Sequence, residues 1–429
     1  MIIQWLMGSA QNSKRSSIVW NAIGGMFNAG QAAIILIFIS YKLGLKTAGM
    51  VTISYAIANL FLTISNYGIR NFQVTDTKNK FTFSDYFYCR CSTTIIAFVL
   101  MIGYISYSYL LGLYSFEKGI ILFEITLLKL NDAFEDVYIG RYQQMGRLDV
   151  GAKIMAVRLI LSTALISILI LANAGIHISL LSGCILSIMS DIFFIKNTFQ
   201  IAEASISTLN TKKILHLLKV CLPLCIGITL AIFIGNIPKY MIDAYMNEEI
   251  QAIFGYIMMP VFVITLLNQF IYQPMIKNLG DLWERKNIRA FKQCIMKQCL
   301  IICGSTAIII AGGLLLGIPV LSLLYNIDLS DYRTEFATLL LGGGFYALAY
   351  YLNVPITTIR KQNYIAVGYV VAAVLSFIFG KYCVLSKGMM GAAILYLGIN
   401  ILLVIVYSAV LLKECRFCIK RQNTQQMNL

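Results

Sequence analysis

The side chains best suited to chemistry lie together in one otherwise apolar stretch, residues 118–138. If this stretch is an α-helix, at about 100° per residue, five of its ionisable side chains fall within about 140° and form one polar stripe. A charge that faces lipid at the centre of a membrane helix costs about 2.5–3.5 kcal/mol or more. We therefore expect the stripe to face protein or water. Its members are Glu124, Lys129, Asp132, Glu135 and Asp136.

Two further charges, Arg158 and Asp191, lie in the next two apolar stretches. Two interpretations stay open. In the first, the charges form salt bridges that fix how the helices pack, with Arg158 as a partner for the carboxylates of the stripe; this suits Glu135 and Asp136. In the second, the charges line a hydrated cavity. The side chains for which we favour the cavity are Lys129, Asp132, Arg158 and Asp191.

Each type of charge suggests a function in such a cavity. A cation such as Lys129 or Arg158 can hold a phosphate or an acidic sugar. A carboxylate can carry a proton or a sodium ion, and one charge moved across about 100 mV is worth about 2.3 kcal/mol. The candidates for ion coupling are Glu124, Asp132 and Asp191. We expect no cofactor apart from such a coupling H+ or Na+, and no metal site, because the 11 cysteines are scattered and only Cys415 and Cys418 form a C-x-x-C pair.

The composition places these residues in a membrane. Of the 429 residues, 59% are hydrophobic and 12% are charged, about half the charge of a soluble protein. The excess of 34 Lys and Arg over 19 Asp and Glu does not require nucleic acid as a partner, because basic residues collect in the cytoplasmic loops of membrane proteins.

We predict an all-α polytopic membrane protein with about twelve transmembrane helices, since stretches of about 20 apolar residues recur along the whole chain. The longest connections lie near 70–91, 198–216 and 274–294. The predicted spans are 17–40, 49–69, 92–113, 118–138, 152–172, 177–197, 217–240, 250–273, 295–318, 334–356, 364–384 and 389–412.

The distribution of Lys and Arg predicts the orientation. With the N-terminus inside, the cytoplasmic segments hold 25 of these residues and the outer loops hold 7, alternating loop by loop. Such a bias is typical of cytoplasmic loops. We expect a multi-pass protein of a bacterial plasma membrane with both termini in the cytoplasm.

The two halves of the chain look alike. Segment 48–55 opens the second span and 252–256 opens the eighth in the same way, while 144–149 and 358–363 form matching links. Two parallel sets of six spans are typical of transporters whose substrate path lies between the halves. The predicted organisation is a cytoplasmic N-terminus (1–16), a first six-helix bundle (17–200), a cytoplasmic linker (201–216), a second six-helix bundle (217–412) and a cytoplasmic tail (413–429).

One stretch carries a specific resemblance. Residues 236–249, which include Asn236, Pro238 and Lys239, are followed by Phe254-Gly255-Tyr256. This region resembles the seventh-to-eighth span region of Wzx-type polysaccharide flippases, the polysaccharide-transporter branch of the multidrug/oligosaccharidyl-lipid/polysaccharide exporter superfamily. Other stretches similar to landmarks of that family are 44–55, 146–147 and 360–362.

The resemblance implies a V-shaped pair of six-helix bundles around a central cavity. It implies an undecaprenyl-pyrophosphate-linked oligosaccharide as substrate, moved to the outer leaflet for O-antigen, capsule or exopolysaccharide synthesis. Membrane lipids and the polymerase and chain-length proteins of the pathway would be partners. Because 118–138 is acidic, a strongly anionic sugar is disfavoured. The candidate cavity residues are Lys129, Arg158, Lys239 and Asn236; for Lys239 a lysine at the membrane interface is the open alternative.

Other functions compete with this one. A multidrug exporter of the same superfamily would use the acidic stripe for organic cations and protons. A membrane polymerase or glycosyltransferase would need an acid–base or metal constellation in an outer loop, and the sequence offers none that is convincing. We therefore expect no enzymatic activity, and a purely structural protein would not need costly charges within its spans.

Overall fold

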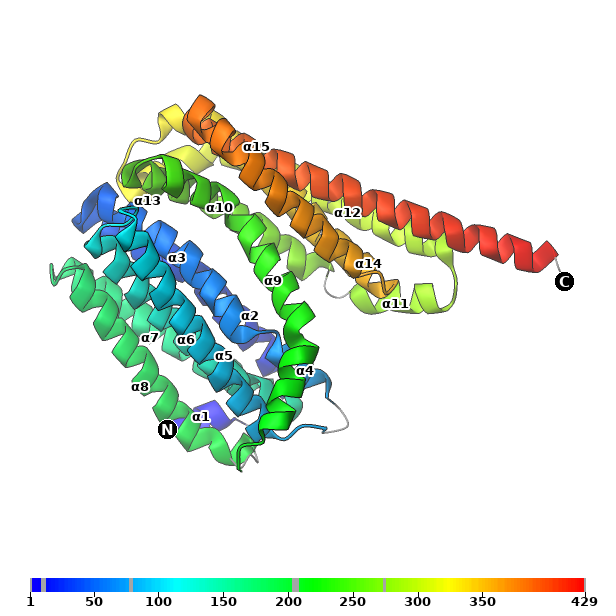
Figure 1. The fold of residues 1–429 in the computed structure, drawn as a ribbon, viewed down its shortest axis with the longest axis horizontal. Coiled ribbons are helices and arrows are strands. Elements are labelled where there is room, and N and C mark those ends of the chain that lie inside the picture. Colours follow the sequence, from blue (N-terminus) through cyan, green and yellow to red (C-terminus); the bar gives the residue numbers. More distant parts are fainter. Residues whose placement is uncertain (1, 9–12, 77–79, 203–207, 273–274, 428–429) are drawn as a thin grey trace. The chain divides into compact units, whose positions relative to one another are not determined.

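The protein is described by a computed structural model that covers residues 2–8, 13–76, 80–202, 208–272 and 275–427. This part of the chain is almost entirely helical and contains no strand (Figure 1). Together with the apolar lengths of the helices, this confirms the predicted fold class, an all-α polytopic membrane protein.

The helices of the first half begin with the short α1 at Ile2–Met7. The others are α2 Ser13–Lys42, α3 Gly44–Asn66, α4 Ile69–Thr75, α5 Phe83–Leu110, α6 Phe116–Gln144, α7 Leu148–Leu171 and α8 Ile176–Ala202. The second half follows with α9 Thr211–Tyr245, α10 Glu248–Tyr272, α11 Ile276–Glu284, α12 Ile288–Gly312, a π-helical turn Gly313–Gly317, α13 Ile318–Tyr325, a 3-10 turn Ser330–Tyr332, α14 Arg333–Thr358 and α15 Asn363–Met427.

The number of spans agrees with twelve. Ten segments of the described chain are long and apolar enough to cross a membrane. The 29-residue α6 is not among these ten, as expected for a helix with a charged stripe. The last of the ten contains two helices, because α15 breaks at Gly388, where φ is 56° and ψ is −134°. Adding α6 and the second part of α15 to the ten gives twelve.

Several predicted boundaries are wrong: the ninth span begins at Ile288 and not near 295, α15 continues to Met427 and not to 412, and part of the expected connection 274–294 is α11. The third span shows a physical reason for such an error. The helix expected to start near 92 begins at Phe83, because Thr82 and Asp85 form a capping box: the Thr82 hydroxyl accepts from the Asp85 N–H, and the Asp85 carboxylate accepts from the Thr82 N–H at 2.8 Å. Part of the expected loop 70–91 is also helical, since α4 starts after the left-handed residues Tyr67 and Gly68. Arg90 therefore lies inside a helix.

The chain divides into two compact units, unit 1 at Met1–Ile232 and unit 2 at Phe233–Leu429. The predicted linker at 201–216 lies partly outside the described residues, and the predicted domain boundaries stay a prediction. In unit 1, α6 packs against α3, α4, α5, α7 and α8, while α2 packs along α7. The charged helix α6 therefore lies among protein neighbours.

Unit 2 is organised around α14, which packs against α10, α12 and α15. Three consecutive glycines make the close approach possible. A Cβ at Gly342 would lie 2.7 Å from Tyr396 of α15, and one at Gly343 would lie 2.7 Å from Val261 of α10. A Cβ at Gly344 would collide with Thr306 of α12. The glycines therefore serve close helix packing, as small residues commonly do in membrane bundles.

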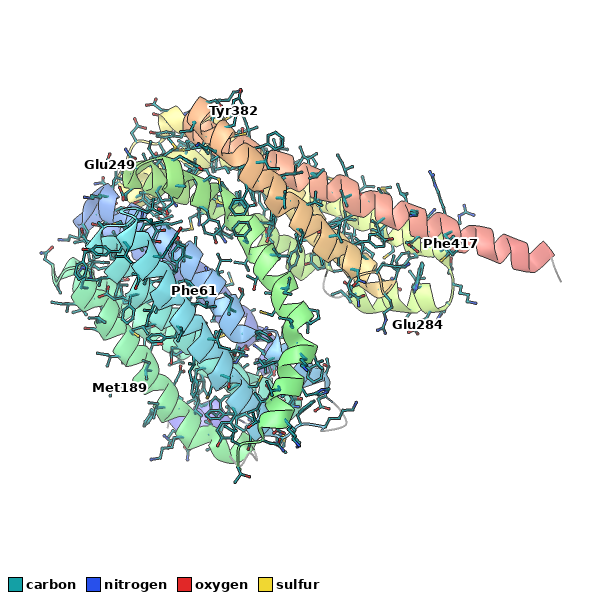
Figure 2. The ribbon with its side chains drawn as sticks, in the orientation of Figure 1. Phe61, Met189, Glu249, Glu284, Tyr382 and Phe417 are labelled. Atoms are coloured by element: carbon teal, nitrogen blue, oxygen red, sulfur yellow. The ribbon has the colours of Figure 1, made fainter. Side chains whose placement is uncertain are left out.

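Large apolar side chains cover the outside of both units. Met189 in unit 1 is 62% exposed, and Tyr382 and Phe417 in unit 2 are 74% and 62% exposed (Figure 2). Water does not favour such a surface, whereas the hydrocarbon of a membrane does.

Candidate functional site

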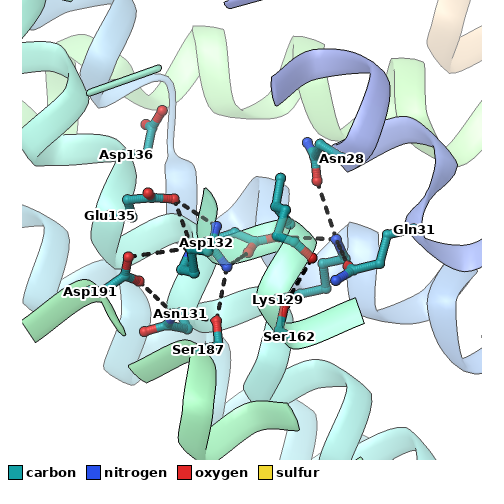
Figure 3. A network of polar contacts seen from close by, with 12 residues as sticks. Asn28, Gln31, Lys129, Asn131, Asp132, Glu135, Asp136, Ser162, Ser187 and Asp191 are labelled. Carbon is teal, nitrogen blue, oxygen red and sulfur yellow. Dashed lines mark hydrogen bonds and ion pairs between the residues drawn. The ribbon is translucent and has the colours of Figure 1, made fainter. Parts of the chain in front are cut away.

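Helix α6 positions the charged residues of unit 1. It begins at Ser115, whose hydroxyl accepts from the Lys118 N–H at 3.2 Å, and it continues without interruption to Gln144. Because consecutive residues of a helix differ by about 100°, Glu135 and Asp136 point to different neighbours. In Figure 3, Glu135 takes part in the polar contacts drawn there and Asp136 stands apart from them.

Arg158 of α7 joins three carboxylates from two other helices. Its guanidinium lies 2.8 Å from Asp132 and 2.6 Å from Glu135, both on α6. It also lies 3.3 Å from Asp191 on α8, and it donates to the Ser187 hydroxyl at 3.0 Å. The Arg158 side chain is 1% exposed. These contacts tie α6, α7 and α8 together by buried ion pairs.

Lys129 extends the same group toward α2. Its ammonium donates to the side-chain oxygens of Asn28 at 3.3 Å and Gln31 at 3.0 Å, and to the Asp132 carboxylate at 3.0 Å. An ammonium has three N–H donors, so these three acceptors satisfy it. Asn131 closes the other side by donating to Asp191 at 2.6 Å.

We call the five charged residues of this group the Arg158 network (Figure 3). Its members are Lys129, Asp132, Glu135, Arg158 and Asp191. Each of their side chains is at most 11% exposed. With all five ionised, two cations face three carboxylates, which leaves one buried negative charge. An uncompensated charge is expensive in such surroundings, so the network is suited to hold one proton or one small cation.

Asp136 belongs to a second charged centre at the end of unit 1 where α6 finishes. Arg70 of α4 donates to one oxygen of Asp136 at 3.0 Å, and Arg90 of α5 donates to the other at 2.7 Å. Two cations therefore share one carboxylate. Arg90 is fully buried, and it also donates to the Ser65 carbonyl and the Asn66 side chain at 2.8 and 2.9 Å.

Asp76, which follows α4, contacts residues at the start of α5. Burial raises the pKa of this carboxyl, but it accepts hydrogen bonds from the N–H groups of Lys80 and Phe81 and from the Tyr86 hydroxyl. These contacts bring the pKa below its ordinary value. Asp76 thereby connects the end of α4 with the start of α5.

The remaining predicted residues lie elsewhere. Glu124 is buried and contacts the His177 ring at 3.1 Å, outside the Arg158 network. Lys239 and Asn236 lie on α9 within unit 2, and they are 6% and 7% exposed. The Lys239 ammonium lies 5.3 Å from the centre of the Phe262 ring, and the described residues offer it no carboxylate.

Solved structures share this fold across almost the whole chain. The lipid II flippase MurJ, in an inward closed conformation, has a TM-score of 0.64 at 15% identity, covering 91% of this chain and 86% of that one. An outward-facing multidrug resistance MATE family transporter of the MOP superfamily has a TM-score of 0.59 at 14% identity, covering 97% and 98%. The Vibrio cholerae MATE transporter VcmN, in a bent form, has a TM-score of 0.60 at 14% identity, covering 97% and 98%.

The chain has the fold of these transporters. No protein-family model and no curated protein matches the sequence. At such low identity the likeness concerns the fold alone, so the site has to be argued from the residues of this chain.

The structure brings together five of the residues singled out in the sequence, and it adds others. These five, Lys129, Asp132, Glu135, Arg158 and Asp191, meet in one network. Sequence reasoning missed Arg70 and Arg90 as a pair, because it placed both in a loop. The capping box at 82–85 could have revealed the earlier helix start. Asn28, Gln31 and His177 gave no comparable signal, because single polar residues at span ends and faces are common.

Proposed function

We propose that this protein is a flippase that moves an undecaprenyl-pyrophosphate-linked oligosaccharide from the cytoplasmic to the outer leaflet of a bacterial plasma membrane. The observation that carries the proposal is Lys239, a buried cation with no carboxylate among the described residues, within a stretch that resembles polysaccharide flippases and a fold that a lipid II flippase shares. Charges within spans are costly and typically mark an ion or substrate path.

The network supports ion coupling of the transport cycle. Its single excess negative charge is removed when one carboxylate binds a proton or a sodium ion. Asp191 suits this role, because its partner Arg158 is shared with two other carboxylates. Loss of the ion would restore the excess charge and favour a conformation in which water reaches the network.

The candidate contacts to the substrate can be inferred from which buried cations already have carboxylate partners. Lys129 and Arg158 are satisfied within the network, so they contact the anionic part of a substrate only in a conformation that opens it. Lys239 has no carboxylate among the described residues, and Asn236 lies one helical turn away on α9. We propose that these two hold the sugar part of the substrate during passage.

A multidrug exporter is the second candidate. The excess negative charge of the network favours it, because a buried carboxylate attracts organic cations, and one of the solved structures above is a multidrug resistance MATE family transporter. The resemblance of residues 236–256 to polysaccharide flippases and the isolated cation Lys239 favour the flippase.

Deletion of the gene in its own host separates the two candidates. The flippase proposal expects loss of surface polysaccharide and accumulation of lipid-linked oligosaccharide on the cytoplasmic side, both restored by the wild-type gene. If the protein is a multidrug exporter, the deletion strain should have intact surface polysaccharide and should retain more of a fluorescent organic cation in its cells. The second result without the first would overturn the flippase proposal.

A further inference from the structure

Unit 1 contains a pocket of about 570 Å³ next to the second charged centre. We call it the Arg70 pocket. Its volume lies within the range of about 300–1,000 Å³ that is usual for small-molecule sites. Its wall combines Arg70 and Asp136 with polar side chains from α3, α4 and α6, namely Asn66, Asn71, Thr75 and Gln143.

The charge of this pocket is positive. Both oxygens of Asp136 are taken, one by Arg70 and one by Arg90, so one unit of positive charge remains when all three are ionised. Asp136 is the single carboxylate among the residues that line the pocket. Arg90 lies behind the wall, because it contacts the lining residues Asn66 and Asp136 while being fully buried. Its Nε–H has no hydrogen-bond partner among the described residues.

Arg70 is the accessible member of the pair. Its side chain is 26% exposed, and its side-chain hydrogen bonds to Asp136 and Gln143, at 3.0 Å each, use two of the five N–H donors of a guanidinium. Donors therefore remain for a ligand. A planar guanidinium matches the paired oxygens of a phosphate better than a lysine does.

We propose that the Arg70 pocket binds the diphosphate group of a polyprenyl-linked substrate. An oxyanion there would neutralise the excess positive charge, and the amide side chains of Asn66 and Asn71 would donate to its outer oxygens or to the first sugar. The polyprenyl source rests on the proposed flippase function, whereas the oxyanion chemistry rests on the pocket alone.

Binding of defined probes to the purified full-length protein in phosphatidylcholine nanodiscs tests this site. Farnesyl diphosphate should bind and raise the melting temperature, inorganic diphosphate should compete with it, and farnesol, which lacks the oxyanion, should do neither. Arg70→Gln should weaken farnesyl diphosphate binding about tenfold or more, since charge-assisted hydrogen bonds are lost. The matched control Arg289→Gln removes an exposed arginine from α12 and should change nothing.

Three outcomes would overturn the site: unchanged affinity in Arg70→Gln, equal binding of farnesol, or complete displacement by phosphatidylglycerol in the nanodisc, which would make it a lipid head-group site. If Arg70→Gln does not fold, Asn71→Asp adds a negative charge at an exposed position of the same wall. That variant should also weaken binding, and unchanged affinity would again overturn the site.

The binding experiment and the gene deletion test two different proposals, so one can fail without the other. If diphosphate binding depends on Arg70 but no lipid-linked oligosaccharide accumulates in the deletion strain, the site stands and the flippase assignment falls. If the oligosaccharide accumulates and binding ignores Arg70, the substrate's diphosphate is held elsewhere and only this inference falls.

Discussion

Buried cations have different partners in the two units. In unit 1, Arg158 and Lys129 are surrounded by carboxylates and amides from three helices, α2, α6 and α8. In unit 2, Lys239 is buried against an aromatic ring. We propose that unit 1 binds the coupling ion and that unit 2 offers a cation to a ligand.

The largest effect is expected from breaking the Arg158 network. Arg158→Leu leaves three buried carboxylates with Lys129 alone, and removing one partner of a buried ion pair costs about 3–5 kcal/mol. The melting temperature of the purified protein should fall strongly. The double variant Arg158→Leu with Glu135→Leu removes one charge of each sign and should recover part of the loss. If the single variant melts like the wild type, the network does not stabilise unit 1.

Unit 2 is expected to depend on close packing. Gly343→Ala places a methyl group 2.7 Å from Val261 between α14 and α10, and such overpacking costs about 1–3 kcal/mol. Thermal unfolding should show this loss. Gly398→Ala on α15 is the matched control, because a Cβ there meets no atom within 4 Å. Equal melting temperatures for the two variants would contradict the packing role.

Lys239 provides the sharpest contrast with Arg158. Lys239→Met removes a buried cation that has no carboxylate, so the protein should become more stable, by about 1 kcal/mol or more. Transport should nevertheless decline, measured as surface polysaccharide at equal protein level. The two buried cations would then have opposite effects on stability. A strong loss of stability in Lys239→Met would show that the units do not differ in this respect.

The smallest effect concerns Asp76, at the loop before α5. Its pKa is lowered in the folded protein, so its stabilisation is present above the ordinary carboxyl pKa and is lost as the pH falls through the lower folded value. Asp76→Asn should reduce stability at neutral pH by less than about 1 kcal/mol, given solvent screening, and should have less effect in acid. Melting curves at both pH values measure this. An equal loss at both would exclude ionisation as the cause.

The sequence predicts the structure best where helical spacing coincides with a high free-energy cost of exposing charged side chains to lipid. The stripe on residues 118–138 combined helical spacing with charges that lipid does not tolerate, so its burial in protein was predictable. Which partner each charge takes was not, because this depends on how α7 and α8 are rotated against α6. The sequence analysis missed the Arg70–Arg90 pair because it placed the start of α5 too late. The first turns of α5 are polar and resemble a loop in sequence. The lack of a carboxylate partner for Lys239 among the described residues depends on tertiary packing, and the sequence alone does not indicate it.

The central claim is that the Arg158 network carries one excess negative charge that a bound ion removes. Infrared difference spectroscopy of the purified protein in sodium-free buffer tests it directly, through the carbonyl band of a buried protonated carboxyl. The wild type should show this band, and sodium or high pH should remove it. Asp191→Asn should lack the band, while Glu249→Gln, an exposed control, should keep it. A full band in Asp191→Asn, or no band in the wild type, would show that the network holds no such ion.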